Sequence, residues 1–138
     1  LVMATRCGEL DPGVIFHLMR EGHSADELEG KLNRESGLKA LGGTGSMKAL
    51  LERDDAAARF AVDHYCHWAI RHAGALIAAM GGVGAIAFTG GIGEHAGPVR
   101  RRILDGLRWA GLDDAACHVI PADEAGELAE AARRVLDG

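Results

Sequence analysis

A short apolar run, Ala85 to Thr89, passes directly into a glycine-rich segment, Gly90 to Gly97. The run shows no alternation of polar and apolar residues, which predicts a strand buried on both faces, as in a parallel sheet. The residues that follow predict a helix from Val99 to Ala110, a strand from His118 to Pro121 and a last helix capped by Asp123. Strand, helix, strand, helix is typical of a βαβα unit, so this end of the chain predicts an α/β fold.

The first eighty residues predict mainly helices. Asp11 and Pro12 form an N-cap followed by a proline that suits the first helical position, and Gly22 ends that helix. Ser24 and Glu27 have the spacing of a capping box. The segment from Gly37 to Lys48 is predicted to be a loop. A long helix is predicted from Asp54 to Met80, with one apolar stripe made of Phe60, Ala61, Tyr65, Trp68, Ala69, Ala73, Leu76, Ile77 and Met80.

The composition narrows the class of protein. With 138 residues the chain has the length of at most one domain, and a net charge of -5 argues against a nucleic-acid partner. Apolar residues make up 48%, enough for a packed core, but no run is long and apolar enough to span a bilayer. The three cysteines form no CxxC motif, which favours a reducing, cytoplasmic setting. Two strands are too few for an open sheet, which favours a chain that is part of a larger sheet domain.

Glycine is the unusual residue, at 20 of 138, about twice the ordinary share of ~7%. Between a buried strand and a helix, glycines let the main chain approach a ligand, and the helix start offers N–H groups to a phosphate. The alternative is a tight connection whose glycines are there only for steric reasons.

Two further glycine patterns resemble nucleotide motifs. Gly91, Gly93 and Ala96 satisfy the G-x-G-x-x-G/A fingerprint of dinucleotide-binding proteins, with Asp123 as the distant acid. The segment from Gly42 to Lys48 resembles a phosphate-binding P-loop but lacks the Gly-Lys-Ser/Thr ending. Both patterns are weak.

Two charged residues are candidates for phosphate chemistry. Arg6, beside a glycine and just before a capped helix, can offer a bidentate fork to a phosphoryl or carboxylate group, or can pair on the surface with Glu9 or Asp11. Glu124 follows the second predicted strand, where it can hold Mg²⁺ through water or serve as an ordinary acidic residue in the first turn of a helix.

Four segments, in this order and spacing, resemble the acetate kinase family, which comprises acetate and propionate kinases. The resemblance covers essentially the whole chain. Thr5-Arg6-Cys7-Gly8-Glu9-Leu10-Asp11-Pro12 is similar to T-R-x-G-D-x-D-P, Glu35-Ser36-Gly37-Leu38 to K/E-S-G-L, Phe88-Thr89-Gly90-Gly91-Ile92-Gly93-Glu94-His95 to F-T-A-G-I-G-E-N, and Val119-Ile120-Pro121-Ala122-Asp123-Glu124 to V-I-P-T-N/D-E.

The resemblance implies an α/β fold of the acetate and sugar kinase, Hsc70 and actin type (ribonuclease H-like), helix-rich with a few parallel strands. Residues 1–138 are then expected to be the C-terminal fragment of the second kinase domain, with the N-terminal domain and the first strands of this domain absent. The implied reaction is transfer of the ATP γ-phosphoryl group to the carboxylate of acetate or a similar short-chain acid, giving acyl phosphate and ADP, with Mg²⁺. The fragment alone is expected to be inactive.

The resemblance also implies roles for particular residues. Arg6 matches the catalytic arginine that stabilises the phosphoryl group in transfer, and Glu124 matches the glutamate associated with Mg²⁺. The predicted nucleotide contacts are Gly91, Ile92, Gly93, Glu94, His95, Ser46, Met47 and Lys48. The chain departs from the family where Ser46-Met47-Lys48 replaces Asp-(Met/Phe)-Arg, residues that help hold the nucleoside.

Two other classes of function remain open at the level of sequence. One is a dinucleotide-binding oxidoreductase module that uses Gly91 to Ala96. The other is a non-catalytic dimerisation piece in which the helix from Asp54 to Met80 pairs with its twin. The family resemblance also implies a homodimer joined through this region. No membrane partner is expected.

Overall fold

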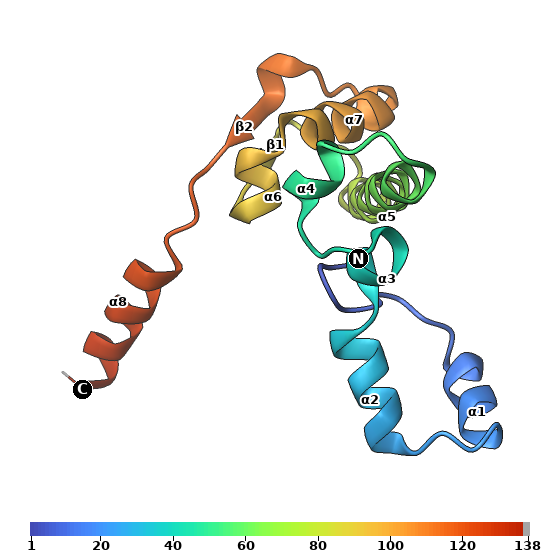
Figure 1. Cartoon of the computed structure of the whole chain (residues 1–138). Coiled ribbons are helices and arrows are strands. Elements are labelled where there is room, and N and C mark those ends of the chain that lie inside the picture. Colours follow the sequence, from blue (N-terminus) through green and yellow to red (C-terminus); the bar gives the residue numbers. More distant parts are fainter. Residues whose placement is uncertain (137–138) are drawn as a thin grey trace.

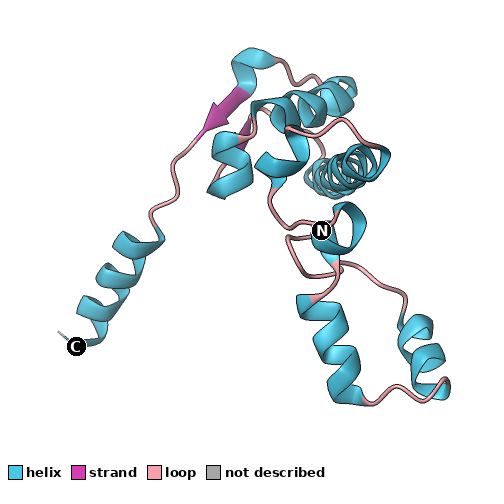
Figure 2. Cartoon of the chain, in the orientation of Figure 1, coloured by secondary structure: helices cyan, strands magenta, loops and turns pink. Residues whose placement is uncertain are grey.

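The computed structural model describes residues 1–136, apart from the side chains of Ala115 and Glu124. The described chain is rich in helix and has two short strands (Figures 1 and 2). In order, the elements are α1 (Pro12–Arg20), α2 (Ala25–Arg34), α3 (Gly37–Gly42), α4 (Met47–Leu51), α5 (Ala56–Met80), β1 (Ile86–Phe88), α6 (Gly90–His95), α7 (Gly97–Leu107), two 3-10 turns (Arg108–Ala110 and Asp114–Ala116), β2 (Cys117–Val119) and α8 (Glu124–Leu136).

The core forms around α5, which packs against α3, α4 and α7. Small residues let these helices come close together. A Cβ atom at Gly42 would lie 3.0 Å from the Cβ of Ala61, and one at Gly106 would lie 2.9 Å from a carbon of the Ile70 side chain. The largest fully buried side chains come from the helices around α5: Leu38, Leu50, Val99 and Leu107.

The N-terminal helices begin where their capping residues predict. Asp11 accepts a hydrogen bond from Gly13 N at 2.6 Å, with Pro12 at the first helical position of α1. The capping box of α2 is present in both directions, because Glu27 accepts from Ser24 N at 2.8 Å and donates its own N–H to Ser24 Oγ at 3.3 Å. The pair α1 and α2 extends away from the core (Figure 1).

The two strands pair in parallel, as predicted, with Ile86 opposite Cys117 and Phe88 opposite Val119. The expectation that the first strand is buried on both faces is wrong for these residues. Ile86 and Phe88 pack against the helical core, whereas Ala87 is exposed. Successive side chains of a strand point to opposite faces, and the described helices cover only one face of this two-stranded sheet.

Two segments predicted as loops contain short helices. Residues 37–48 form α3 and the start of α4, and Gly90–His95 forms α6. Glycine-rich composition argues against helices of this length in isolation, but here contacts with the core supply the stability: Leu38 is fully buried and Ile92 packs against the core cluster.

The stripe predicted on the long helix is only partly buried. Ala61 and Ile77 are buried, but Phe60, Leu76 and Met80 are largely exposed. The reason is that α3, α4 and α7 pack on the face of α5 that carries Ala61, Val62 and Cys66, and they leave the apolar side chains outside this face uncovered.

The last helix, α8, is linked to β2 by an extended segment and projects from the rest of the molecule (Figure 1). Asp123 accepts a hydrogen bond from Gly126 N at 2.9 Å, which confirms it as the cap of this helix. Three large apolar side chains of α8 are exposed: Leu128, Val135 and Leu136. None of the helices described in residues 1–136 is both long and apolar enough to cross a membrane.

Candidate functional site

A cleft of about 750 Å³ lies between α4 and α6. It brings together six of the eight residues that the sequence predicts as nucleotide contacts, from segments more than forty positions apart. Sequence reasoning missed two further lining residues, Leu51 and Glu52, and named Ala96 only for the dinucleotide fingerprint. The full lining is Ser46, Met47, Lys48, Leu51, Glu52, Gly91, Ile92, His95 and Ala96.

The α4 wall of the cleft is held by its own caps. Ser46 Oγ accepts a hydrogen bond from Ala49 N at 3.3 Å, so this hydroxyl starts the helix. Buried Met47 anchors the helix in the core, while Lys48 stays exposed. Arg53, which follows α4, is connected to the end of α3, because its guanidinium donates a hydrogen bond to Gly42 O at 2.6 Å.

The glycines of the α6 wall differ in what they face. A Cβ atom at Gly91 would meet nothing within 4 Å, so this residue leaves open space where it lines the cleft. A Cβ atom at Gly93 would lie 3.2 Å from the carbonyl carbon of Phe88, so Gly93 permits close packing on β1. The steric interpretation therefore describes Gly93, whereas Gly91 is free to let a ligand approach the backbone.

Glu94 does not line the cleft. Its carboxylate accepts a hydrogen bond from Ala122 N at 3.0 Å, which ties α6 to the segment after β2. The backbone of the same turn is held from the other side, because Arg100 donates to the carbonyl oxygens of Gly93 and Glu94, both at 2.8 Å.

The segment that carries Arg6 is laid against the start of α3. The carbonyl oxygens of Met3, Ala4 and Thr5 accept hydrogen bonds from Leu38 N at 2.9 Å, Lys39 N at 3.0 Å and Ser36 N at 2.9 Å. These bonds satisfy helix-start N–H groups that have no partner within the helix. Two of the segments that resemble the family motifs, around Arg6 and around Gly37, are thus a single structural unit.

Gly37 makes this contact possible. Its φ of +65° is a conformation that side chains rarely adopt, and a Cβ atom there would lie 2.8 Å from Arg6 O. Residues 3–7 therefore approach α3 at a distance that only glycine allows.

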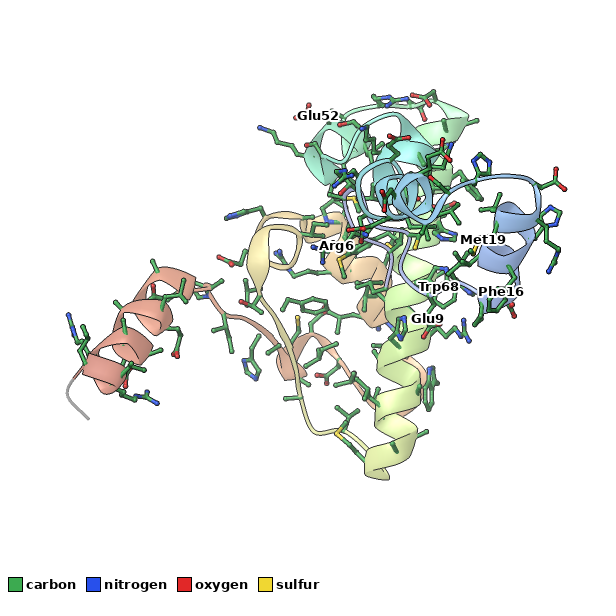
Figure 3. All side chains as sticks on the ribbon, turned by 90° about the horizontal axis from the view of Figure 1, so that it is seen from below. Arg6, Glu9, Phe16, Met19, Glu52 and Trp68 are labelled. Atoms are coloured by element: carbon green, nitrogen blue, oxygen red, sulfur yellow. The ribbon has the colours of Figure 1, made fainter. Side chains whose placement is uncertain are left out.

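The Arg6 side chain is exposed, and neither predicted surface partner pairs with it. Asp11 caps α1, and Glu9 lies instead within 3.5 Å of Arg71 on α5. Figure 3 shows Glu9 near Trp68, which also lies on α5, and shows Arg6 apart from both. The guanidinium of Arg71 also lies over the Trp68 ring, 4.4 Å from its centre. The Arg6 guanidinium has no ion pair with a described residue, which leaves it free for an anion.

Glu124 begins α8, but its side chain lies outside the described residues. Among the described side chains, no group of three or more His, Cys, Asp or Glu is arranged to hold a metal ion. Mg²⁺ that accompanies a nucleotide is ordinarily bound through one or two carboxylates together with phosphates and water.

The chemistry of the cleft suits a ligand with an apolar and a polar part. Met47, Leu51 and Ile92 offer apolar surface, and Lys48, Glu52 and His95 offer charge and hydrogen bonds. Such a mixture is typical of small-molecule sites.

The chain is matched by the model of the Acetokinase family over residues 1–128. Such a match across nearly all of the sequence shows that the chain belongs to this family. The family match supports the kinase interpretation and not the dinucleotide-binding alternative.

Individual relatives are acetate kinases. One, from Syntrophobacter fumaroxidans, is 42% identical over 94% of this chain and 38% of its own length. Another, from Streptomyces coelicolor, is 44% identical over 98% of the chain and 34% of its own length. The crystal structure of Porphyromonas gingivalis acetate kinase superposes with a TM-score of 0.88 at 26% identity, covering 99% of this chain and 41% of that one. The chain therefore spans well under half the length of these relatives.

Proposed function

We propose that the protein transfers the γ-phosphoryl group of ATP to the carboxylate of acetate or a similar short-chain acid, giving acyl phosphate and ADP. Membership of the Acetokinase family supports the reaction class. The single observation that carries the proposal is the cleft between α4 and α6, which gathers six predicted nucleotide contacts from two distant segments.

In this proposal the cleft holds the nucleoside of ATP, with the base on the apolar surface of Met47, Leu51 and Ile92. Arg6 binds the phosphoryl group during transfer, because a planar guanidinium matches its oxygens and offsets the charge that they share. Glu124 helps to hold Mg²⁺, which would neutralise phosphate charge. Phosphoryl transfer depends on positioning and charge neutralisation, so these residues need no covalent role.

We also propose that residues 1–138 form the C-terminal part of the second kinase domain and that the acceptor pocket is built by other residues. The relatives support this, since the chain covers 38% of the first and 34% of the second. A homodimer that pairs through α5 is part of the proposal, motivated by exposed Phe60, Leu76 and Met80. A cytoplasmic setting fits the three free cysteines.

The test is an acyl-phosphate assay, in which the full-length protein is given ATP, Mg²⁺ and acetate or propionate, and the product is trapped with hydroxylamine. We expect turnover that falls about 10³-fold in Arg6→Ala while nucleotide binding persists. Arg20→Ala, on exposed α1, is the matched control and should leave the rate unchanged. The 138-residue chain alone should show no turnover, and robust activity from it would refute the assignment of the acceptor pocket to other residues.

A further inference from the structure

Glu52 is the carboxylate that the site leaves without a partner. Three acidic residues lie between α4 and α5, and two of them are engaged. Asp54 pairs with Arg59, and Asp55 pairs with Arg53 at 2.7 Å and caps α5 through Ala58 N at 3.0 Å. Within residues 1–136, no hydrogen bond or ion pair holds the Glu52 side chain in place.

Helix electrostatics do not explain why an acid stands here. Glu52 is the C-cap residue of α4, where the negative end of the helix dipole disfavours a carboxylate. Lys48, four residues earlier, is not paired with Glu52 among the described residues, so no local ion pair offsets this cost. A position that costs the helix stability and lines a cleft is one where a ligand can offset the cost.

The surroundings of Glu52 indicate which part of a ligand it meets. It lies one helical turn beyond Lys48 on the α4 wall, facing a cleft whose opposite wall is Gly91, Ile92 and His95. A carboxylate repels phosphate groups, so it favours the uncharged end of a nucleotide at this wall. Of the groups at that end, the ribose offers two neighbouring hydroxyls, which can donate to the two oxygens of one carboxylate.

We propose that Glu52 accepts hydrogen bonds from the ribose hydroxyls of the nucleotide and makes the cleft select ribonucleotides over deoxyribonucleotides. This inference rests on the proposed nucleotide site and adds a specificity-determining residue to it. Ser46 does not take this role, because its hydroxyl is used as the cap of α4.

The experiment measures the affinity of the full-length protein for ADP and for 2′-deoxy-ADP by calorimetry. A hydrogen bond to a charged group predicts that the wild-type protein binds ADP at least about 10-fold more tightly. In Glu52→Ala, ADP loses the bonds from both hydroxyls whereas 2′-deoxy-ADP loses only that from its 3′-hydroxyl, so ADP affinity should fall further and the ratio should approach one. Glu52→Gln keeps one acceptor and should give an intermediate ratio.

The matched control is Glu29→Gln, an exposed glutamate on α2 outside the cleft, which should keep the wild-type ratio. Glu52 is itself exposed, so its variants should fold, and circular dichroism checks this. An unchanged ratio in Glu52→Ala would overturn the role of Glu52 and leave the nucleotide site standing. Failure of the wild-type protein to bind either nucleotide would overturn the nucleotide site and this inference together.

Discussion

The carboxylate of Glu94 and the backbone N–H of Ala122 are joined by a hydrogen bond of 3.0 Å across 28 residues of sequence. The bond links the segments that follow the two parallel strands, just beyond the carboxyl end of each. Ligand sites of parallel sheets lie at this edge. Glu94 thus ties α6, one wall of the cleft, to the segment after β2 without lining the cleft itself.

Removal of this bond should release the segment after β2. We expect Glu94→Ala to speed hydrogen exchange at the Ala122 amide by about 10-fold, because the amide loses its acceptor. Glu94→Gln keeps an acceptor oxygen and should retain most of the protection. Glu127→Ala, an exposed change on α8, serves as the control. Equal exchange in all four proteins would show that the bond does not hold this segment.

Gly91 and Gly93 should respond differently to added side chains. Gly91→Val should leave the melting temperature nearly unchanged, because nothing lies within 4 Å of the Cβ position, but should weaken ADP binding at least about 10-fold by occupying the cleft. Gly93→Ala should lower stability by about 1 kcal/mol, because its Cβ presses on the Phe88 backbone. Thermal unfolding and calorimetric titration separate the two effects, and a reversed pattern would contradict the assignment.

Gly37 should be among the least replaceable glycines. Gly37→Ala combines an unfavourable positive φ with a clash against Arg6 O, and we expect a loss of about 2–4 kcal/mol in the free energy of unfolding. Gly43→Ala is the matched control, since its φ is +80° but nothing lies within 4 Å, and it should cost only about 1 kcal/mol. Urea unfolding measures both, and similar losses would mean that the contact with residues 3–7 adds nothing.

Acid should weaken the start of α5. The pKa of Asp55 is lowered from its ordinary value of 3.8, because Arg53 and the N–H of Ala58 donate hydrogen bonds to it. The unfolded chain therefore takes up this proton first as the pH falls. The stabilisation from Asp55 is complete above the unfolded pKa and is lost as the pH drops through the lower folded pKa.

The corresponding variant is Asp55→Asn, which keeps a capping acceptor but does not titrate. Its free energy of unfolding should fall less steeply than that of the wild type between about pH 5 and about pH 2. Urea unfolding across this range provides the measurement. Parallel curves for the two proteins would exclude Asp55 as a source of the acid sensitivity.

The starts of several helices can be predicted from neighbouring residues alone. The caps Asp11, Ser24 and Asp123 mark helix starts correctly, because each depends only on neighbouring residues. The helices α3 and α6 could not be predicted in this way. Their sequences are rich in glycine, and burial against α5 and β1 outweighs that weak intrinsic preference.

The site was predictable to a similar degree. Family resemblance selects Ser46, Lys48 and Gly91, and the structure places all three on one cleft. Glu52 belongs to no matched motif, and only its spacing of four residues from Lys48 hints that both share a helix face. The role of Glu94 as a tether could not be predicted, because Ala122 contributes a backbone amide that sequence does not distinguish.

The projecting position of α8 affects the local stability of the last part of the described chain. A two-stranded sheet is marginal by itself, and Leu128, Val135 and Leu136 of α8 remain largely in water. The helices α3, α5 and α7 share a common buried core, whereas residues 117–136 add little to it. For the described residues taken by themselves, we therefore expect two units of different stability, the helical core and residues 117–136. The second should open through local fluctuations that leave the first intact, long before global unfolding exposes the backbone of α5.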